Sequence, residues 1–423
     1  MDILIKKAII VDKTSPYHNK TADILIRNGN ITEIGENIAA EDDIQRYAAE
    51  GLHVSAGWLD LRANFCDPGF EQKEDIDSGI AAAAQGGFTG VCIMPSTQPP
   101  IHSKSQVEYV KRKAAGKAVD IFPIGAISHN IEGGELAEMY DMYQSGAVAF
   151  SDDKKNVSHA GVMMRALMYA KNFDAPVFTF ASDKSVNGKG MMNEGINSTL
   201  LGMKGMPGLA EEIAVARDLQ LCEYCETGLH FTAVSTAKSV SLIREAKAKG
   251  LKVTADISVY SLAADDSALH DFDTNYKVKP PLRTQTDIEA LKQGLLDGTI
   301  DAICSDHTPE DIENKAVEFE IAAFGITGLE SAYGIIQKNT KDVLSVEQVI
   351  EKLSYGPRQV LKHPNSTIFV GGKANLTLFN PIAEWTFGED HIKSKSRNTP
   401  FIGASLVGKP LAIYNNGQFV VCD

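Results

Sequence analysis

The sequence predicts an α/β protein in which a (β/α)8 TIM barrel is joined to a small β-sandwich domain formed by both chain ends. Between residues 56 and 369, eight short apolar runs alternate with longer segments of helical hydrophobic period, a pattern typical of parallel strands joined by helices. Residues 1–55 and 370–423 instead show strand-like alternation. A chain of 423 residues is long enough for a barrel of roughly 250 residues and a second, smaller unit.

The two chain ends are predicted to pair into one small sheet or sandwich. Residues 3–11 and 23–34 alternate enough to form strands, and Asn28-Gly29 within the second segment supplies the positive φ angles of a tight hairpin turn. A similar pattern returns in residues 374–379 and 411–421. Domain boundaries are therefore expected near residues 55 and 370.

The middle of the chain supplies the predicted barrel. The eight strand candidates are residues 57–65, 89–95, 120–128, 147–152, 176–182, 229–235, 252–258 and 301–307. The helix candidates between them are residues 74–85, 104–115, 133–144, 159–172, 209–226, 236–249 and 286–296. Gly86-Gly87, Gly146 and Gly250 stand where helix C-caps are expected. Active sites in such barrels lie at the C-terminal ends of the strands, so the residues at those ends decide the function.

The composition argues against several functional classes. The chain has 43% hydrophobic and 23% charged residues, which is ordinary for a globular core. A net charge of -14 argues against nucleic-acid and anionic-membrane partners, because a phosphate-binding face needs a surplus of Lys and Arg. Lys6 and Lys7 interrupt the first apolar run, and no run approaches about 20 apolar residues. A cytoplasmic protein is expected.

The six cysteines do not form a metal-site pattern. Only Cys222 and Cys225 have a metal-like spacing, and a zinc site of this type needs a second pair that the sequence lacks. Both lie in a predicted helix. We therefore expect them to be core or surface residues without a redox or metal role.

The first predicted barrel strand carries a recognisable motif. Residues 58–69, WLDLRANFCDPG, resemble the D-x-H-x-H-x-R-[ED]-P-G motif of dihydroorotases in the amidohydrolase superfamily. Further matches cover nearly the whole chain, in residues 81–89, 94–99, 146–153, 192–195, 277–283, 306–309, 324–330 and 394–401. The resemblance implies a barrel of the metal-dependent hydrolase type. It also implies a place in pyrimidine biosynthesis, where dihydroorotases interconvert carbamoyl aspartate and dihydroorotate.

The resemblance implies histidine ligands for a divalent metal on the first, fifth and sixth strands, but these positions are substituted. They carry Arg62, Asn64, Phe180 and Ala233. Phe and Ala donate no lone pair, and Arg is not deprotonated in proteins. The bridging acid is retained as Asp152 or Asp153, and Lys154 and Lys155 are expected to be solvated loop charges. No cofactor is therefore expected, except zinc if an atypical site survives.

The positions that hold substrate in the family are also substituted. Cys66 replaces the arginine that grips the substrate carboxylate, and Ser96 and Lys279 replace two asparagines. Loss of the arginine fork removes one of the strongest contacts available to a carboxylate. Asp306 keeps the position of the family's catalytic acid-base on the eighth strand, as a base or as a structural carboxylate with satisfied hydrogen bonds.

The remaining residue patterns offer no other chemistry. His129, His230 and His307 could point into the barrel mouth, but a closed metal site needs three or four ligands that cannot be assembled here. The sequence has no G-x-S-x-G elbow, no P-loop and no G-x-G-x-x-G fingerprint after a strand.

Three hypotheses follow. The first is a catalytically inactive dihydroorotase-like pseudoenzyme that acts as a structural partner of aspartate transcarbamoylase in an oligomer, as the resemblance to inactive homologues implies. The second is an active dihydroorotase or related cyclic amide hydrolase with an atypical single-metal or metal-free site built on Asp152, Asp153 and Asp306. The third is a ligand-binding module in which Arg62 and Lys279 hold an anion.

Overall fold

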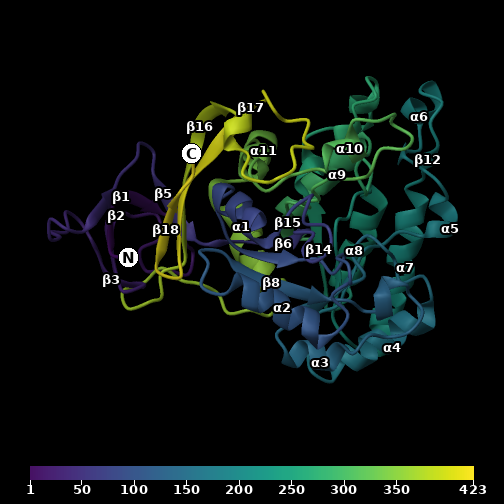
Figure 1. The fold of residues 1–423 in the computed structure, drawn as a ribbon, viewed down its shortest axis with the longest axis horizontal. Coiled ribbons are helices and arrows are strands. Elements are labelled where there is room, and N and C mark those ends of the chain that lie inside the picture. The colour runs from purple at the N-terminus through teal and green to yellow at the C-terminus, as the bar shows by residue number, and fades with distance from the viewer.

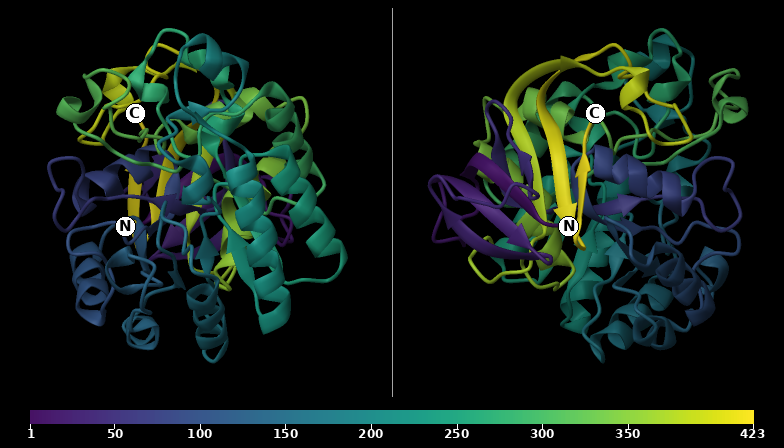
Figure 2. Two further views of the ribbon diagram at one scale, coloured as in Figure 1. Left: turned by 90° about the vertical axis from the view of Figure 1, so that its right-hand side faces the viewer. Right: turned by 60° about the vertical axis from the view of Figure 1, so that its left-hand side comes forward.

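The two chain ends hydrogen-bond into one sheet. The computed structural model describes all 423 residues. Its eight-stranded sheet has the order β18-β17-β16-β5-β1-β2-β3, with β4 paired to β1. The strands are β1 (Ile3–Ile10), β2 (Thr21–Arg27), β3 (Asn30–Gly35), β4 (Gln45–Tyr47), β5 (His53–Ala56), β16 (Leu376–Thr386), β17 (Ser405–Asn415) and β18 (Gln418–Val421). In Figure 1 and the right view of Figure 2, the yellow strands β16–β18 lie between the purple N-terminal strands and the barrel.

The junction between the chain ends is the pairing of β5 with β16. These strands run antiparallel, with Val54 opposite Leu378, and β5 is also parallel to β1. The positive φ angles at Asn28 (50°) and Gly29 (78°) form the expected hairpin turn between β2 and β3. A cluster of 17 buried hydrophobic residues from both ends fills this part of the molecule. The division of the chain near residues 55 and 370 stays a prediction.

Eight parallel strands close into the barrel, as predicted. They are β6 (Trp58–Ala63), β7 (Phe88–Ile93), β8 (Asp120–Gly125), β9 (Ala149–Phe150), β10 (Phe178–Thr179), β13 (Leu229–Phe231), β14 (Val253–Ser258) and β15 (Ala302–Cys304). They form the sheets β6-β7-β8-β9 and β10-β13-β14-β15. Parallel bridges from Phe150 to Val177 and from Ala63 to His307 join the two sheets and close the ring.

Helices cover the barrel. The long ones are α1 (Ile76–Gln85), α2 (Lys104–Ala114), α4 (Ala160–Lys171), α7 (Leu209–Cys225), α8 (Ala237–Ala248), α9 (Gln285–Leu296) and α11 (Ala332–Thr340). Shorter ones are α3 (Met139–Gln144), α5 (Lys184–Asn187), α6 (Ile196–Leu200), α10 (Ile312–Lys315), α12 (Val346–Ile350) and α13 (Gly356–Val360), with β11 (Met192–Asn193) pairing with β12 (Gly205–Met206). None of these helices combines the length and the apolar character that a membrane crossing requires.

Local sequence explains where several helices begin and end. Asp75 accepts a hydrogen bond from the backbone of Ser78 and forms a capping box at the start of α1. Gly87 (φ 84°) and Gly250 (φ 85°) follow the ends of α1 and α8 in the left-handed region that glycine favours. The helix predicted over residues 133–144 is too long. It begins at Met139, because residues 128–136 instead form a turn in which the His129 amide donates to the Glu135 carbonyl.

Cys222 and Cys225 lie on α7 as buried free thiols. The Cys222 thiol donates to the carbonyl of Thr227, and burial raises its pKa to about 11. A thiol with a raised pKa is a weak nucleophile at neutral pH.

Candidate functional site

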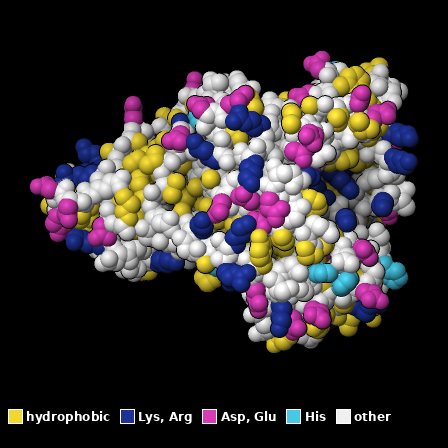
Figure 3. All heavy atoms as spheres, in the orientation of Figure 1, with side chains coloured by type: hydrophobic (Ala, Val, Ile, Leu, Met, Phe, Trp, Pro, Cys, Tyr) yellow, Lys and Arg dark blue, Asp and Glu magenta, His cyan; other side chains and the backbone are white.

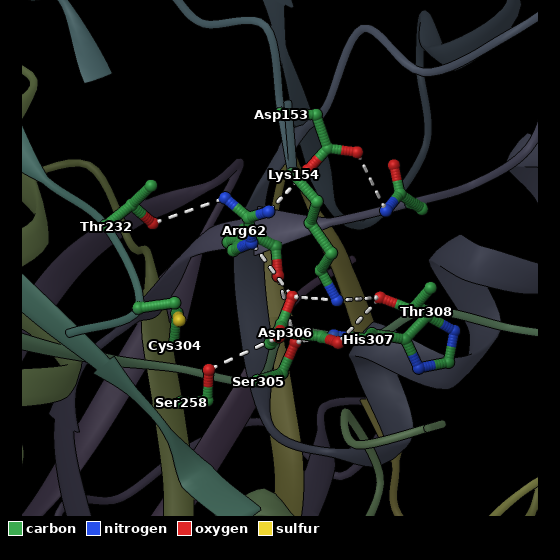
Figure 4. Close-up of polar contacts among 12 residues, drawn as sticks. Arg62, Asp153, Lys154, Thr232, Ser258, Cys304, Ser305, Asp306, His307 and Thr308 are labelled. Carbon is green, nitrogen blue, oxygen red and sulfur yellow. Dashed lines mark hydrogen bonds and ion pairs between the residues drawn. The ribbon is translucent and has the colours of Figure 1, made fainter. Parts of the chain in front are cut away.

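Arg62 lies at the centre of the C-terminal mouth of the barrel. Its side chain extends from the end of β6 and is fully buried. The guanidinium Nε donates to Asp306 Oδ1 at 2.8 Å, and Nη2 donates to Asp153 Oδ1. The guanidinium Cζ lies 5.5 Å from the centroid of the Phe180 ring. Figure 4 shows the guanidinium between the carboxylates of Asp153 and Asp306. One cation therefore joins the ends of three different strands.

Asp306 is surrounded by hydrogen-bond donors. Besides Arg62, its carboxylate accepts from the Tyr260 hydroxyl at 2.6 Å and from Ser258 Oγ at 3.3 Å, and Lys154 Nζ lies 3.0 Å from Oδ1. Burial raises the pKa of Asp306, but the charges of Lys154 and Arg62 outweigh burial and hold the pKa below its ordinary value. Asp306 is therefore an ionised carboxylate whose oxygens are already engaged.

The arginine is held permanently charged by the same contacts. Burial lowers the pKa of Arg62, but the negative charges of Asp153 and Asp306 together raise it by more. The net shift is therefore upward. Two carboxylates and the two cations Arg62 and Lys154 give this cluster no net charge. A buried ion-pair network is tolerated when each member is paired and hydrogen-bonded in this way.

The structure decides which of the two acids faces the site. Asp152 turns away, because its carboxylate accepts from the amides of Ile127 and Ser128, both at 2.9 Å. Asp153 contacts Arg62 and accepts from Asn64 Nδ2 at 3.4 Å. Of the two acids, Asp153 therefore faces Arg62 and Asp152 does not.

The expectation that Lys154 is a solvated loop charge is wrong. Its side chain is only 16% exposed, and Nζ binds Asp306 and also donates to Thr308 Oγ1 at 3.0 Å. A chain position just after a strand suggested solvent exposure, but Asp306 from a distant strand end draws the ammonium inward. Lys155 is exposed, as expected.

The other predicted positions divide into two groups. Phe180 packs against Arg62, and Lys279 Nζ lies 5.5 Å from the centroid of the Phe180 ring. Ala233 is buried nearby with φ 54°, and its amide donates to Asp256 Oδ1 at 2.6 Å. Cys66 and Ser96 make no side-chain hydrogen bond to Arg62 or its carboxylates, and burial raises the pKa of Cys66 to about 12.

The three histidines at the strand ends have local partners. His307 Nε2 lies 3.3 Å from Glu74, and Nδ1 accepts from the Gly328 amide at 3.2 Å. His230 bridges Thr254 and Asp256, both at 2.9 Å. His129 packs against His102, with ring centroids 4.5 Å apart. None of them contacts Asp153 or Asp306. Sequence reasoning missed Tyr260 and also Thr232, whose Oγ1 accepts a hydrogen bond from Arg62 Nη1 at 3.4 Å. Neither residue carried a motif signal.

Asp60, another buried acid on β6, provides a prediction about how stability depends on pH. Asp60 accepts hydrogen bonds from the amide of Ser305 at 2.7 Å and from its hydroxyl at 2.6 Å. Burial nevertheless raises the pKa of Asp60 from 3.8 to about 7. Because the folded-state pKa exceeds the unfolded one, the contribution of Asp60 to stability is complete below about pH 4 and is lost as the pH rises to about 7.

Asp60→Asn mimics the protonated acid and is expected to remove this dependence. From pH 5 to pH 7, the free energy of unfolding of the variant should rise relative to wild type by about 2 kcal/mol, measured by urea denaturation. Asp271→Asn, at an exposed position without an ion pair, is the matched control. A pH-independent difference between Asp60→Asn and wild type would contradict the raised pKa.

Comparison with known proteins first gives the class. The fold matches L-hydantoinase (dihydropyrimidinase) from Arthrobacter aurescens with a TM-score of 0.85 at 22% identity, covering 99% of this chain and 96% of that one. A D-hydantoinase matches with a TM-score of 0.84 at 26% identity, covering 100% and 96%. The protein therefore has the metal-dependent hydrolase type of (β/α)8 barrel found in the amidohydrolase superfamily.

Sequence comparison then gives the family. The family described as "Dihydro-orotase-like" matches residues 52–239. A "Dihydroorotase" of Trichlorobacter lovleyi is 40% identical over 422 residues, covering 99% of both chains. A "Dihydroorotase" of Caldanaerobacter subterraneus subsp. tengcongensis is 42% identical over 413 residues, covering 96% of this chain and 94% of the relative. The chain belongs to the dihydroorotase family.

The residues in this site do not fit the divalent metal that the family implies. No group of three or more His, Cys, Asp or Glu side chains is arranged to hold a metal ion. Asp153 and Asp306 converge, but Arg62 joins them, and Phe180 and Ala233 offer no donor atoms. Asn64 Oδ1 is buried without a hydrogen-bond partner and is the one free acceptor in this group.

Proposed function

We propose that this dihydroorotase-family chain does not hydrolyse cyclic amides and instead acts as a structural partner of aspartate transcarbamoylase. The observation that carries the first part is the guanidinium of Arg62 between Asp153 and Asp306. A cation in that position forms ion pairs with both carboxylates and repels a metal ion. The choice of aspartate transcarbamoylase as the partner rests on the resemblance to inactive homologues of the family.

The chemistry of amide hydrolysis supports this proposal. Attack on an amide carbonyl at neutral pH needs a water with a lowered pKa, which metal coordination supplies in hydrolases of this kind. Asp306 is ionised, but Arg62, Lys154 and Tyr260 engage its oxygens. A general base needs a free oxygen within hydrogen-bond reach of the proton it takes.

The second candidate is an active dihydroorotase or related cyclic amide hydrolase with an atypical site. The comparisons favour this candidate over the first, because relatives about 40% identical over the full length are named dihydroorotase. In this reading, Asp306 would take the proton and zinc is the metal to be tested. The observation against this second candidate is that Arg62 occupies both Asp153 and Asp306, the acids that would bind the metal.

A single assay separates the two candidates. Purified protein, supplied with Zn²⁺ or with chelator, is mixed with dihydroorotate or carbamoyl aspartate, and interconversion is followed by absorbance. We expect turnover at least about a thousandfold below the roughly 10 s⁻¹ of an ordinary enzyme. Turnover at an ordinary rate that Asp306→Asn abolishes would establish the second candidate and overturn the first.

The partner is tested in the same preparation. The assay is repeated with aspartate transcarbamoylase from the same organism, and the mixture is passed over a size-exclusion column. Co-elution of the two chains without gain of dihydroorotase turnover is expected. Separate elution at micromolar concentrations would contradict the structural role.

A further inference from the structure

A basic cavity opens at the C-terminal mouth of the barrel. Its volume is about 900 Å³, and it lies between the segment after β9, the segment from α5 to β12, and the loop that contains Phe324. Seven lysines line it: Lys154, Lys155, Lys184, Lys189, Lys204, Lys277 and Lys279. Figure 3 shows dark-blue side chains gathered around the hollow on the right-hand side of the molecule.

The lysines of this cavity are largely unpaired. Among the seven, only Lys154 forms an ion pair with a carboxylate, that of Asp306. The acids in the lining are Glu132, Asp152 and Glu320, and none of them pairs with a lysine. The chain as a whole carries a net charge of -14, so this local excess of positive charge runs against the composition. Clefts lined by one sign of charge concentrate ions of the opposite sign.

Two of these lysines are held inside the wall of the cavity. Lys277 is 2% exposed, and its Nζ donates to the carbonyls of Phe319 at 2.6 Å and Glu320 at 2.9 Å. Lys279 Nζ donates to the carbonyl of Lys154 at 3.2 Å. Burying an ammonium group without a carboxylate partner costs free energy, which a bound anion would offset.

The lowered pKa of Lys279 also indicates that its ammonium group lacks sufficient stabilising negative charge. Burial lowers its pKa most, and the charge of Lys154 lowers it further. The charge of Asp153 opposes this shift without cancelling it. Burial likewise lowers the pKa of Lys277. Several like charges therefore lie close together, and among these lysines only Lys154 has an ion-pair partner. Such an arrangement is destabilising unless a ligand of opposite charge binds to it.

We propose that this cavity binds a small polyphosphorylated anion. Lysines from several chain segments suit a ligand with several spread negative charges, and the volume lies within the range of small-molecule sites. No arginine lines the cavity. Arginine binds both carboxylate and phosphate through its planar fork, whereas the lysine ammonium binds phosphate as a point charge and needs no fixed planar geometry. This site does not depend on whether Asp306 acts in catalysis.

The test uses the full-length protein and inorganic tripolyphosphate in metal-free buffer, with binding measured by isothermal titration calorimetry. One molecule per chain is expected to bind, with an affinity that falls as salt is raised. The variant Lys184→Gln/Lys189→Gln/Lys204→Gln changes three exposed lysines of the lining, so the fold should persist. It is expected to weaken binding at least about tenfold.

The control variant is Lys104→Gln/Lys238→Gln/Lys341→Gln. It removes the same charge at exposed positions outside the cavity that form no ion pair, and its affinity should stay within about twofold of wild type. Equal weakening in both triple variants, or binding that does not saturate, would show a general charge effect and overturn the proposal. Tighter binding of citrate than of tripolyphosphate at matched ionic strength would overturn the phosphate assignment.

Discussion

Replacing Arg62 by methionine is expected to lower the free energy of unfolding by about 3–5 kcal/mol. The guanidinium is fully buried and contacts both Asp153 and Asp306, with only Lys154 as a further cation at Asp306. Its removal leaves carboxylate charge buried without compensation. Urea denaturation followed by circular dichroism measures the loss.

A matched control and a second substitution separate charge from packing. Arg112→Met removes an exposed arginine that forms no ion pair, and it should change stability by less than about 0.5 kcal/mol. The double variant Arg62→Met/Asp306→Asn should lose less stability than the two single losses added together, because the single changes break the same pair. Simple additivity would mean that Arg62 acts through packing alone.

Restoring the four imidazoles is expected to create a zinc site. The variant Arg62→His/Asn64→His/Phe180→His/Ala233→His places four histidines around Asp153 and Asp306. It should bind about one to two equivalents of Zn²⁺, because imidazole and carboxylate are the ligands that zinc prefers. Histidine is among the residues that tolerate the left-handed backbone found at Ala233 (φ 54°). Binding is read by elemental analysis after gel filtration.

Zinc should also stabilise this variant. At a free metal concentration about a thousandfold above the dissociation constant, the gain in unfolding free energy is about 4 kcal/mol. The half-restored variant Arg62→His/Asn64→His retains Phe180 and Ala233 and should bind zinc more weakly. If wild type itself carried near-stoichiometric zinc after the same gel filtration, the conclusion that its donor set does not fit the metal would be wrong.

The barrel could be predicted because its signals are local and repeated. All eight strand candidates overlap a strand of the closed barrel, although β9 and β10 comprise only two residues each. Strand period, helix period and C-cap glycines are each read within about a dozen residues. The predicted helix over residues 133–144 is too long for a reason that is also local. The turn around His129 takes up the first residues of that segment.

The site could be predicted in part. The family motif placed Arg62, Phe180 and Asp306 together before any geometry was known, and they do converge. The motif could not separate Asp152 from Asp153, since adjacent side chains depend on local backbone direction and Asp153 has a φ of 54°. Ordinary burial preferences gave the wrong environment for Lys154.

The sequence by itself determined the family, the barrel and the absence of imidazole at four metal positions, because these follow from residue type and order along the chain. Only the tertiary structure decided which side chains meet at the mouth of the barrel. Arg62 meets Asp153 across 91 positions of sequence and Asp306 across 244. Contacts at such separations depend on how the barrel closes. The same closure brings Lys154, Lys184 and Lys279 to one cavity, which no local pattern of residues encodes.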